Sequence, residues 1–438
     1  MYLCSLCTSR IHSQTSFSNM SYAANEYPVE KAPLVDVEAL PTFIIQEKRP
    51  SVARRFVKTV FAVFSVFFIL SLFRHGPSYA KLSRGCHGII SGSDDGGHQH
   101  PFPPGDKWVP YKGTTHFELE PAEASGFTVK GTQAFGKVIF ETSKLSDKVV
   151  IDLDIKTNKV DQDNDISVEE KDGYITVDTT SAKKLKTRAA AKILIPSNII
   201  GTFGLESFEL DLPRHMVDYS ALPKSLEIGE FTIRLGKGFV KPGAVHTNTT
   251  TITIAQGALH GSLTQARHET SINVAKGNVT LDISDISSGN EGVSNIKLGD
   301  GHLKGSLPVY NSTTVDVAKG SIYLNVDFES ASEENRAELS TKVGSGPARV
   351  YVDSIAANRL FKAYHTSISG DQMITYPDNF QGTIDARGLA GSIKLEGEDV
   401  IVEKVLGGLQ GKKGDSERNY VSVKAAKGAL DILVGDRD

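Results

Sequence analysis

One short phrase with a central glycine recurs along the chain, and it constrains the fold more than any other feature. The phrase reads VAKGNVTLDI at 274–283, VAKGSIYLNV at 317–326 and AAKGALDILV at 425–434. Apolar and polar residues alternate on both sides of each glycine, and this period of two predicts strands with one buried face and one wet face. The glycine, preceded two residues earlier by alanine, predicts a corner where a bulky side chain would collide or where φ must be positive.

A second phrase interleaves with the first, reading IAQGALHGSL at 254–263 and LGDGHLKGSL at 298–307. The four central glycines, at 257, 277, 301 and 320, are separated by 20, 24 and 19 residues. This spacing predicts stacked coils, each of which buries its apolar face on the next. Two alternating phrases predict a unit of two coils, and a degraded unit runs from Gly388 to the Gly428 phrase. The rival is an antiparallel sandwich, for which EKDGY at 170–174 is a hairpin signal.

The expected fold class is therefore all-β, a parallel β-helix or β-solenoid over residues 112–438. Within it we expect irregular coils mixed with hairpins at 112–250 and regular repeats at 251–328. A surface loop is expected at 329–346, because ESASEENRAELSTKVGSG is polar. C-terminal coils are expected at 347–435.

An uncharged stretch, TVFAVFSVFFILSLF, occupies residues 59–73. As a helix its rise of about 22 Å is short of the roughly 30 Å hydrocarbon core, so the predicted transmembrane helix extends over 56–74. A buried core helix or a cleaved signal peptide fits less well, because no amphipathic partner helices follow and about fifty polar residues precede the stretch. The flanking bases Lys48, Arg49, Arg54, Arg55 and Lys58 place the N-terminus in the cytosol.

We therefore expect a single-pass signal-anchor protein of the plasma membrane or the Golgi. Residues 1–55 are expected to be a disordered cytosolic tail and 75–111 a flexible stalk, with the β body lumenal or extracellular. Three N-glycosylation sequons, at Asn248, Asn278 and Asn311, lie on that outer side. The alternation points Asn278 outward, where a glycan is tolerated.

The chain has three cysteines, Cys4, Cys7 and Cys86, so disulfides do not hold the fold together. Cys86 is the one thiol expected in an oxidising compartment. An unpaired secretory cysteine predicts an intermolecular disulfide and hence a homodimer; a free buried thiol is the alternative.

The repeated A-K-G phrases and ITYPDNFQGTIDARGLAGSIKL at 374–395 resemble the putative-adhesin β-solenoid domains of unknown function found in bacteria and fungi. The order of tail, anchor helix and outer body resembles the fungal membrane-anchored members. The resemblance covers 112–435 and is clearest after Thr250. It implies a β-solenoid and an adhesive role, and it carries no catalytic residues to this chain.

No residue set predicts an active site, a metal site or a cofactor. A net charge of −4 with interspersed acids and bases argues against nucleic-acid binding. The run DQDND, with Asp161, Asp163 and Asp165, resembles the start of a calcium loop, but Ile166 stands where glycine is needed and Asp172 where glutamate is expected. A solvated acidic turn is the better interpretation. The Cys and His residues of 86–106 lie in a Gly, Ser and Pro-rich segment typical of a stalk.

Two functions remain. The first is a non-enzymatic, adhesin-like or structural protein that binds cell wall, glycan or protein partners. The alternative is a membrane-tethered carbohydrate-active enzyme, a lyase or glycosidase, which needs converging carboxylates. Asp282, Asp316 and Asp431 occupy different coil positions, and His260 and Lys304 share one. An outward ladder of Asp, Glu or Arg on adjacent coils favours the enzyme, whereas ladders of Thr, Asn and Ser favour the adhesive protein.

Overall fold

The structure is a computed structural model, and it describes residues 108–158, 165–181, 186–201, 204–284, 292–328, 336–356 and 358–435. The expected cytosolic tail, the transmembrane segment 56–74, most of the stalk and Cys86 lie outside these residues. Within the described ranges, no helix has the length and apolarity needed to span a membrane.

The described residues form one 24-stranded sheet and a short 3₁₀ helix, η1 (Ser197–Ile199), so the all-β prediction is confirmed. The first strands are β1 (Val109–Pro110), β2 (His116–Leu119), β3 (Gly126–Lys130), β4 (Ala134–Ser143), β5 (Val149–Thr157), β6 (Ser167–Lys171), β7 (Tyr174–Asp178), β8 (Thr187–Pro196), β9 (Leu205–Asp218), β10 (Glu227–Lys241), β11 (His246–Thr264) and β12 (Glu269–Ser284). The others are β13 (Val293–Val309), β14 (Ser312–Phe328), β15 (Ala337–Ser345), β16 (Ala348–Ile355), β17 (Phe361–Ser369), β18 (Gln372–Tyr376), β19 (Gly382–Ala390), β20 (Ile393–Gly397), β21 (Ile401–Val405), β22 (Gly408–Lys413), β23 (Tyr420–Lys427) and β24 (Leu430–Val434).

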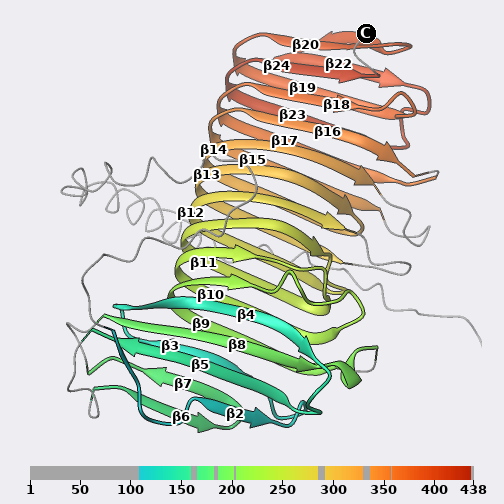
Figure 1. The fold of residues 1–438 in the computed structure, drawn as a ribbon. Helices are drawn as coiled ribbons and strands as arrows, with labels where there is room; N and C mark the ends of the chain where they lie inside the picture. The colour runs from blue at the N-terminus through green and yellow to red at the C-terminus, as the bar shows by residue number, and fades with distance from the viewer. Residues whose placement is uncertain are drawn as a thin grey trace, which may run out of the picture. The chain divides into compact units, whose positions relative to one another are not determined.

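From β9 to β14, each strand pairs in parallel with the next, so successive coils stack (Figure 1). The repeated glycines are direct partners across this stack, in the order Gly238, Gly257, Gly277, Gly301 and Gly320. Gly346, Gly370, Gly428 and Gly391 continue the same line, each meeting the backbone of the glycine before it. We call this line the glycine ridge. The prediction that Gly277 and Gly320 share a ridge is confirmed.

The ridge requires glycine for two reasons. At Gly277 φ is +147°, a region that side chains with a Cβ rarely adopt. A Cβ added there would also overlap the carbonyl oxygen of Gly257 and lie 2.7 Å from its carbonyl carbon. The ridge is a corner, because the inward alternation stops three residues before the glycine and resumes two residues after it.

The interior is filled by the inward residues of the coils, including two aromatic clusters. Phe140, Phe208, Tyr219 and Phe231 meet edge to face near the N-terminal end of the stack. Phe361 stacks on Phe328 with ring centroids 4.1 Å apart and contacts Tyr376 and Phe380. Buried hydroxyl groups in the middle coils form hydrogen bonds. The hydroxyls of Thr250 and Thr247 are 2.7 Å apart, and the Ser294 hydroxyl donates to Gln265 Oε1 at 2.6 Å.

At both ends of the stack, spatial order departs from sequence order. The strands β3 and β4 lie between β7 and β8 on one side and β9 on the other. Likewise, β23 and β24 insert in parallel between β17 and β18 on one side and β19 and β20 on the other. Antiparallel strands then close each end, β5 and β6 at one and β22 and β21 at the other. Capping strands of this kind limit the exposed sheet edge.

Several expected boundaries were wrong. The segment 329–346 is not all loop, because Ala337, Leu339, Thr341 and Val343 point inward and form β15. Glu338, Ser340 and Lys342, which made this part of the segment look like a loop, are the outward half of that strand. Regular coils begin at β9, earlier than the expected residue 251. In β9 the ridge position is His215 instead of glycine, so this coil does not match the repeated glycine phrase.

Two further corrections concern the ends of the body. Residues 108–111, expected to belong to the stalk, are part of the β body, because Trp108 packs edge on against Phe135 with ring centroids 5.9 Å apart and β1 pairs with β5. In the C-terminal coils, Gly391 lies on the ridge and Gly388 does not, since Gly388 pairs with Ala425. The hairpin expected at EKDGY is confirmed: β6 and β7 are antiparallel, and Asp172 and Gly173 both have positive φ in the turn.

Candidate functional site

A surface groove of about 760 Å³ lies where β9, β10 and β11 begin. It is lined by Glu120, Pro121, Ala122, Ile199, Gly204, Glu206, Gly229, Glu230, Asn248, Thr249 and His268. Parallel register brings these residues together, because Glu230 of β10 is the direct partner of Thr249 in β11 and of Ser207, the residue after Glu206, in β9. Gly229 lines the groove without a side chain. A Cβ at this position would overlap the backbone carbonyl oxygen of Glu206.

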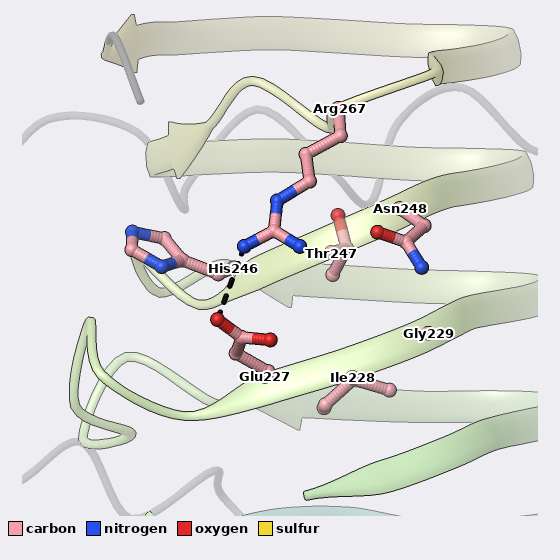
Figure 2. A pocket seen from close by; sticks show the side chains of 7 residues that line it. All are labelled: Glu227, Ile228, Gly229, His246, Thr247, Asn248 and Arg267. Carbon is pink, nitrogen blue, oxygen red and sulfur yellow. Dashed lines mark hydrogen bonds and ion pairs between the residues drawn. The ribbon is translucent and has the colours of Figure 1, made fainter. Parts of the chain in front are cut away.

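A smaller hollow shares Gly229 and Asn248 with the groove (Figure 2). Glu227 and Arg267 point toward one another across it, and Arg267 Nη2 lies 3.0 Å from Glu227 Oε1. Both side chains are about one third to one half exposed, so this ion pair adds little to stability. The hollow's volume of about 10 Å³ holds roughly one water, so the larger groove is the candidate for a ligand.

The groove offers carboxylates, an amide, a hydroxyl and an imidazole, groups that hydrogen-bond to sugar hydroxyls or to peptide groups. Catalytic acids and bases usually carry strongly shifted pKa values. Among the described residues, the groups with the largest pKa shifts are His215, Tyr219, His365 and Tyr376, all of them buried inside the stack. None of these four lines the groove.

The buried histidines are structural. Burial lowers the pKa of His365 to about 3, and its neutral ring connects Thr341 at 2.8 Å to the Tyr376 hydroxyl at 3.0 Å. Burial also lowers the pKa of His215 to about 4, although its Nε2 lies 2.9 Å from the Ala189 carbonyl oxygen. Both rings are therefore neutral at physiological pH.

A second surface feature follows directly from the register. Six residues on successive coils stand in one outward line, six positions before the ridge glycine in each coil: Thr232, Thr251, Ser271, Asn295, Thr314 and Ser340. We call this line the hydroxyl ladder. All six are half-buried, because each is flanked by its neighbours above and below. Every rung offers a hydroxyl or an amide, and none carries a charge.

The predicted glycosylation residues occupy three different settings. Asn248 borders the groove, Asn278 follows ridge Gly277, and Asn311 lies between β13 and β14. All three are half-buried, and the Asn278 Oδ1 accepts a hydrogen bond from His302 N at 3.3 Å. Their modification stays a prediction.

The remaining expectations from the sequence fall into three groups. His260 and Lys304 share a register position with Thr280 between them, as predicted. Asp282, Asp316 and Asp431 do stand at different positions along their coils. Of the calcium-loop residues, Asp161 and Asp163 lie outside the described residues, and Asp172 is a turn residue. In the part of the chain that the structure describes, no three His, Cys, Asp or Glu side chains gather closely enough to hold a metal ion.

The sequence analysis did not predict the groove. It stated that ladders of Thr, Asn and Ser would favour an adhesive protein, but it did not locate one. The groove includes Glu120 and Ile199, which no repeat phrase contains. The ladder could have been predicted from the sequence, because aligning the segments on their central glycines places Thr251, Ser271, Asn295 and Thr314 at the same position.

Comparison with known proteins adds no assignment. No protein-family model matches the chain, and no curated protein matches it. Among solved structures, the chain is similar to a putative cell adhesion protein from Clostridium sporogenes, with 14% identity, a TM-score of 0.17, and coverage of 74% of this chain and 100% of that one. At this TM-score the likeness carries no argument about fold or function.

Proposed function

We propose that this chain is a non-enzymatic, adhesin-like or structural protein whose β-solenoid body presents long, repetitive outer faces to a cell-wall glycan or a protein. In the same proposal, residues 56–74 anchor it in the membrane with the N-terminus cytosolic and the body outside. Cys86 then sits near the base of the body, where it can link two copies.

The hydroxyl ladder supports this proposal most directly. Catalysis needs a few unlike groups that converge on one bond, whereas the ladder repeats like groups at intervals of about 4.8 Å, the spacing of paired strands. Repeated weak contacts add up when the partner is itself repetitive. A polymer with regularly spaced hydroxyls, such as a wall glycan, fits that description.

The test is retention of the purified full-length chain on insoluble wall polysaccharide. Replacing three adjacent rungs together, Thr251→Ala, Ser271→Ala and Asn295→Ala, is expected to lower retention without changing the circular dichroism spectrum. A matched control changes Ser262→Ala and Asn325→Ala, which point outward on the other wall of the coil, five residues after the ridge glycine. Equal retention of the ladder variant, the control and the wild type would exclude the ladder as the contact surface.

The proposed topology has its own test. Intact microsomes treated with protease are expected to lose the N-terminal tail and keep the β body. Glycosidase treatment is expected to shift the body in steps that disappear one by one in Asn248→Gln, Asn278→Gln and Asn311→Gln. Protection of the tail would reverse the orientation.

A second candidate, a membrane-tethered lyase or glycosidase, is favoured by the groove. Its carboxylates, Glu206 and Glu230, stand on neighbouring coils at the edge of a hollow large enough for sugar residues. Release of reducing ends from soluble polysaccharide, lost in the double variant Glu206→Gln with Glu230→Gln, would establish this activity. Absence of product with the wild type would leave the adhesive function.

A further inference from the structure

The coils carry a strongly basic strip around the glycine ridge, although the whole chain has a net charge of −4. The strip comprises the six aligned segments 234–241, 253–260, 273–280, 297–304, 316–323 and 342–349. Together they hold nine Lys and Arg against two Asp, a net charge of +7. We call this surface the ridge strip.

Its cations stand in three columns that the register defines. Lys237, Lys276 and Lys319 are exposed one residue before the ridge glycine, at the apex of the corner. Arg234, Lys297 and Lys342 lie on one side of the corner, and Lys241, Lys304 and Arg349 on the other. Adjacent coils are about 4.8 Å apart, so the columns run along the stack.

Few carboxylates neutralise these cations. Arg234 pairs with Glu209 on the neighbouring coil β9, which also places Asp211 beside Arg234 and Asp218 beside Lys241; Asp218 pairs with Lys137. The other eight basic side chains form no ion pair with a carboxylate of the described chain. Each of the two acids stands between two lysines, Asp300 between Lys276 and Lys319, and Asp316 between Lys297 and Lys342. Unpaired cations concentrated in a line attract a polyanion and release its counterions.

The shape of the ridge strip favours binding of a linear polymer over binding of a flat surface. The ridge positions are glycine, and the positions two residues before them are Gly236, Ala255, Ala275, Gly299, Ala318 and Gly344. Small residues therefore flank the apex lysines on both sides, so a chain can lie along the corner close to the backbone. Because the three columns point in different directions around a corner, a membrane plane could meet only the apex column.

The side chains also distinguish between classes of polyanion. Proteins that bind single-stranded nucleic acids supply aromatic platforms for the bases. The strip has two aromatic residues, Phe239 and Tyr323, which lie on separated coils, and Lys304 already covers the Tyr323 ring at 5.7 Å. We therefore infer that the ridge strip binds a linear acidic polysaccharide, one whose sugars bear carboxylate, phosphate or sulfate groups. The inference rests on the proposed function for an outward-facing, adhesive body.

The experiment measures binding of the purified full-length chain to polygalacturonate and dextran sulfate, with unmodified dextran as the uncharged polymer of the same backbone. We expect binding to both polyanions and not to dextran, with an affinity that falls linearly with salt on logarithmic axes. The ridge variant, K237Q with K276Q and K319Q, is expected to lose at least about tenfold in affinity and to show a shallower salt dependence.

A matched control separates the strip from general charge. The variant K144Q with K171Q and K224Q removes three exposed lysines that lie away from the strip, and it is expected to bind within about twofold of the wild type. Equal losses in the ridge and control variants would overturn the inference. So would tighter binding of single-stranded RNA or of phosphatidylserine vesicles than of either polysaccharide.

The hydroxyl-ladder variant distinguishes this inference from the proposed function. It is expected to bind dextran sulfate like the wild type while its retention on wall polysaccharide falls. Normal wall retention with no polyanion binding would overturn the ridge inference alone. Polyanion binding through the ridge lysines, with no retention on wall material by any form of the chain, would overturn the proposed wall contact alone.

Discussion

Replacing Gly277 by alanine tests the central physical claim about this fold, that coils can stack only where the ridge lacks side chains. At φ +147° the alanine is strained by about 1–3 kcal/mol. Its Cβ would also overlap the Gly257 carbonyl oxygen, and relieving that overlap displaces backbone that pairs β11 with β12, at about 1–3 kcal/mol more. The expected loss in the free energy of unfolding is therefore about 2–6 kcal/mol.

The assay is urea unfolding of the full-length chain, followed by far-ultraviolet circular dichroism. Gly407→Ala is the matched control, because Gly407 also has positive φ (+76°) but a Cβ there meets no atom within 4 Å. Its expected cost is about 1 kcal/mol from the backbone conformation alone. Repeat proteins can unfold in parts, so hydrogen exchange should locate the loss in β11–β13. Equal, small losses in both variants would refute the steric argument.

Two further predictions concern the interior. Phe361→Ala, which removes a fully buried ring stacked 4.1 Å from Phe328, is expected to cost about 3–5 kcal/mol in urea unfolding, whereas Leu406→Ala at an exposed turn should be neutral. The free energy of unfolding should also fall in acid. In the folded chain the pKa values of His365 and His215 are about 3 and 4. Below the ordinary pKa of 6.5, the unfolded chain therefore binds protons that the folded chain does not. The loss develops as the pH falls from about 6.5 to 3, reaching at most about 3–5 kcal/mol per histidine. Unfolding measured at several pH values should show that the free energy of unfolding falls less steeply with decreasing pH in His365→Gln than in the wild type.

The sequence predicted the middle of the stack well because its constraint is local. A ridge glycine and its flanking alternation lie within ten residues, so the phrases at Gly257, Gly277, Gly301 and Gly320 could be aligned without knowing their partners. The same is true of the hairpin at Asp172 and Gly173, where the turn type needs two positive φ values.

The ends were beyond sequence reasoning because alternation says which face of a strand is buried and not which strand lies beside it. Nothing in β23 marks it for insertion between β17 and β19. Polarity misled in β15 for a related reason: Glu338, Ser340 and Lys342 are the wet half of a strand whose inward residues include Thr341, itself polar and bonded to His365.

The same logic explains why charge counted along the chain misrepresents the surface. In parallel, in-register coils, residues far apart in sequence become neighbours when they hold the same position relative to the ridge glycine. Bases from distant parts of the sequence are then gathered beside the ridge, where nine Lys and Arg stand with two Asp, and a chain of net charge −4 acquires a strip of net charge +7. The glycines that let the coils approach also keep side chains from covering the corner beside those lysines. Close stacking and an open, basic ridge are thus two consequences of one backbone requirement, so substitutions that thicken the ridge should damage folding and polyanion binding together.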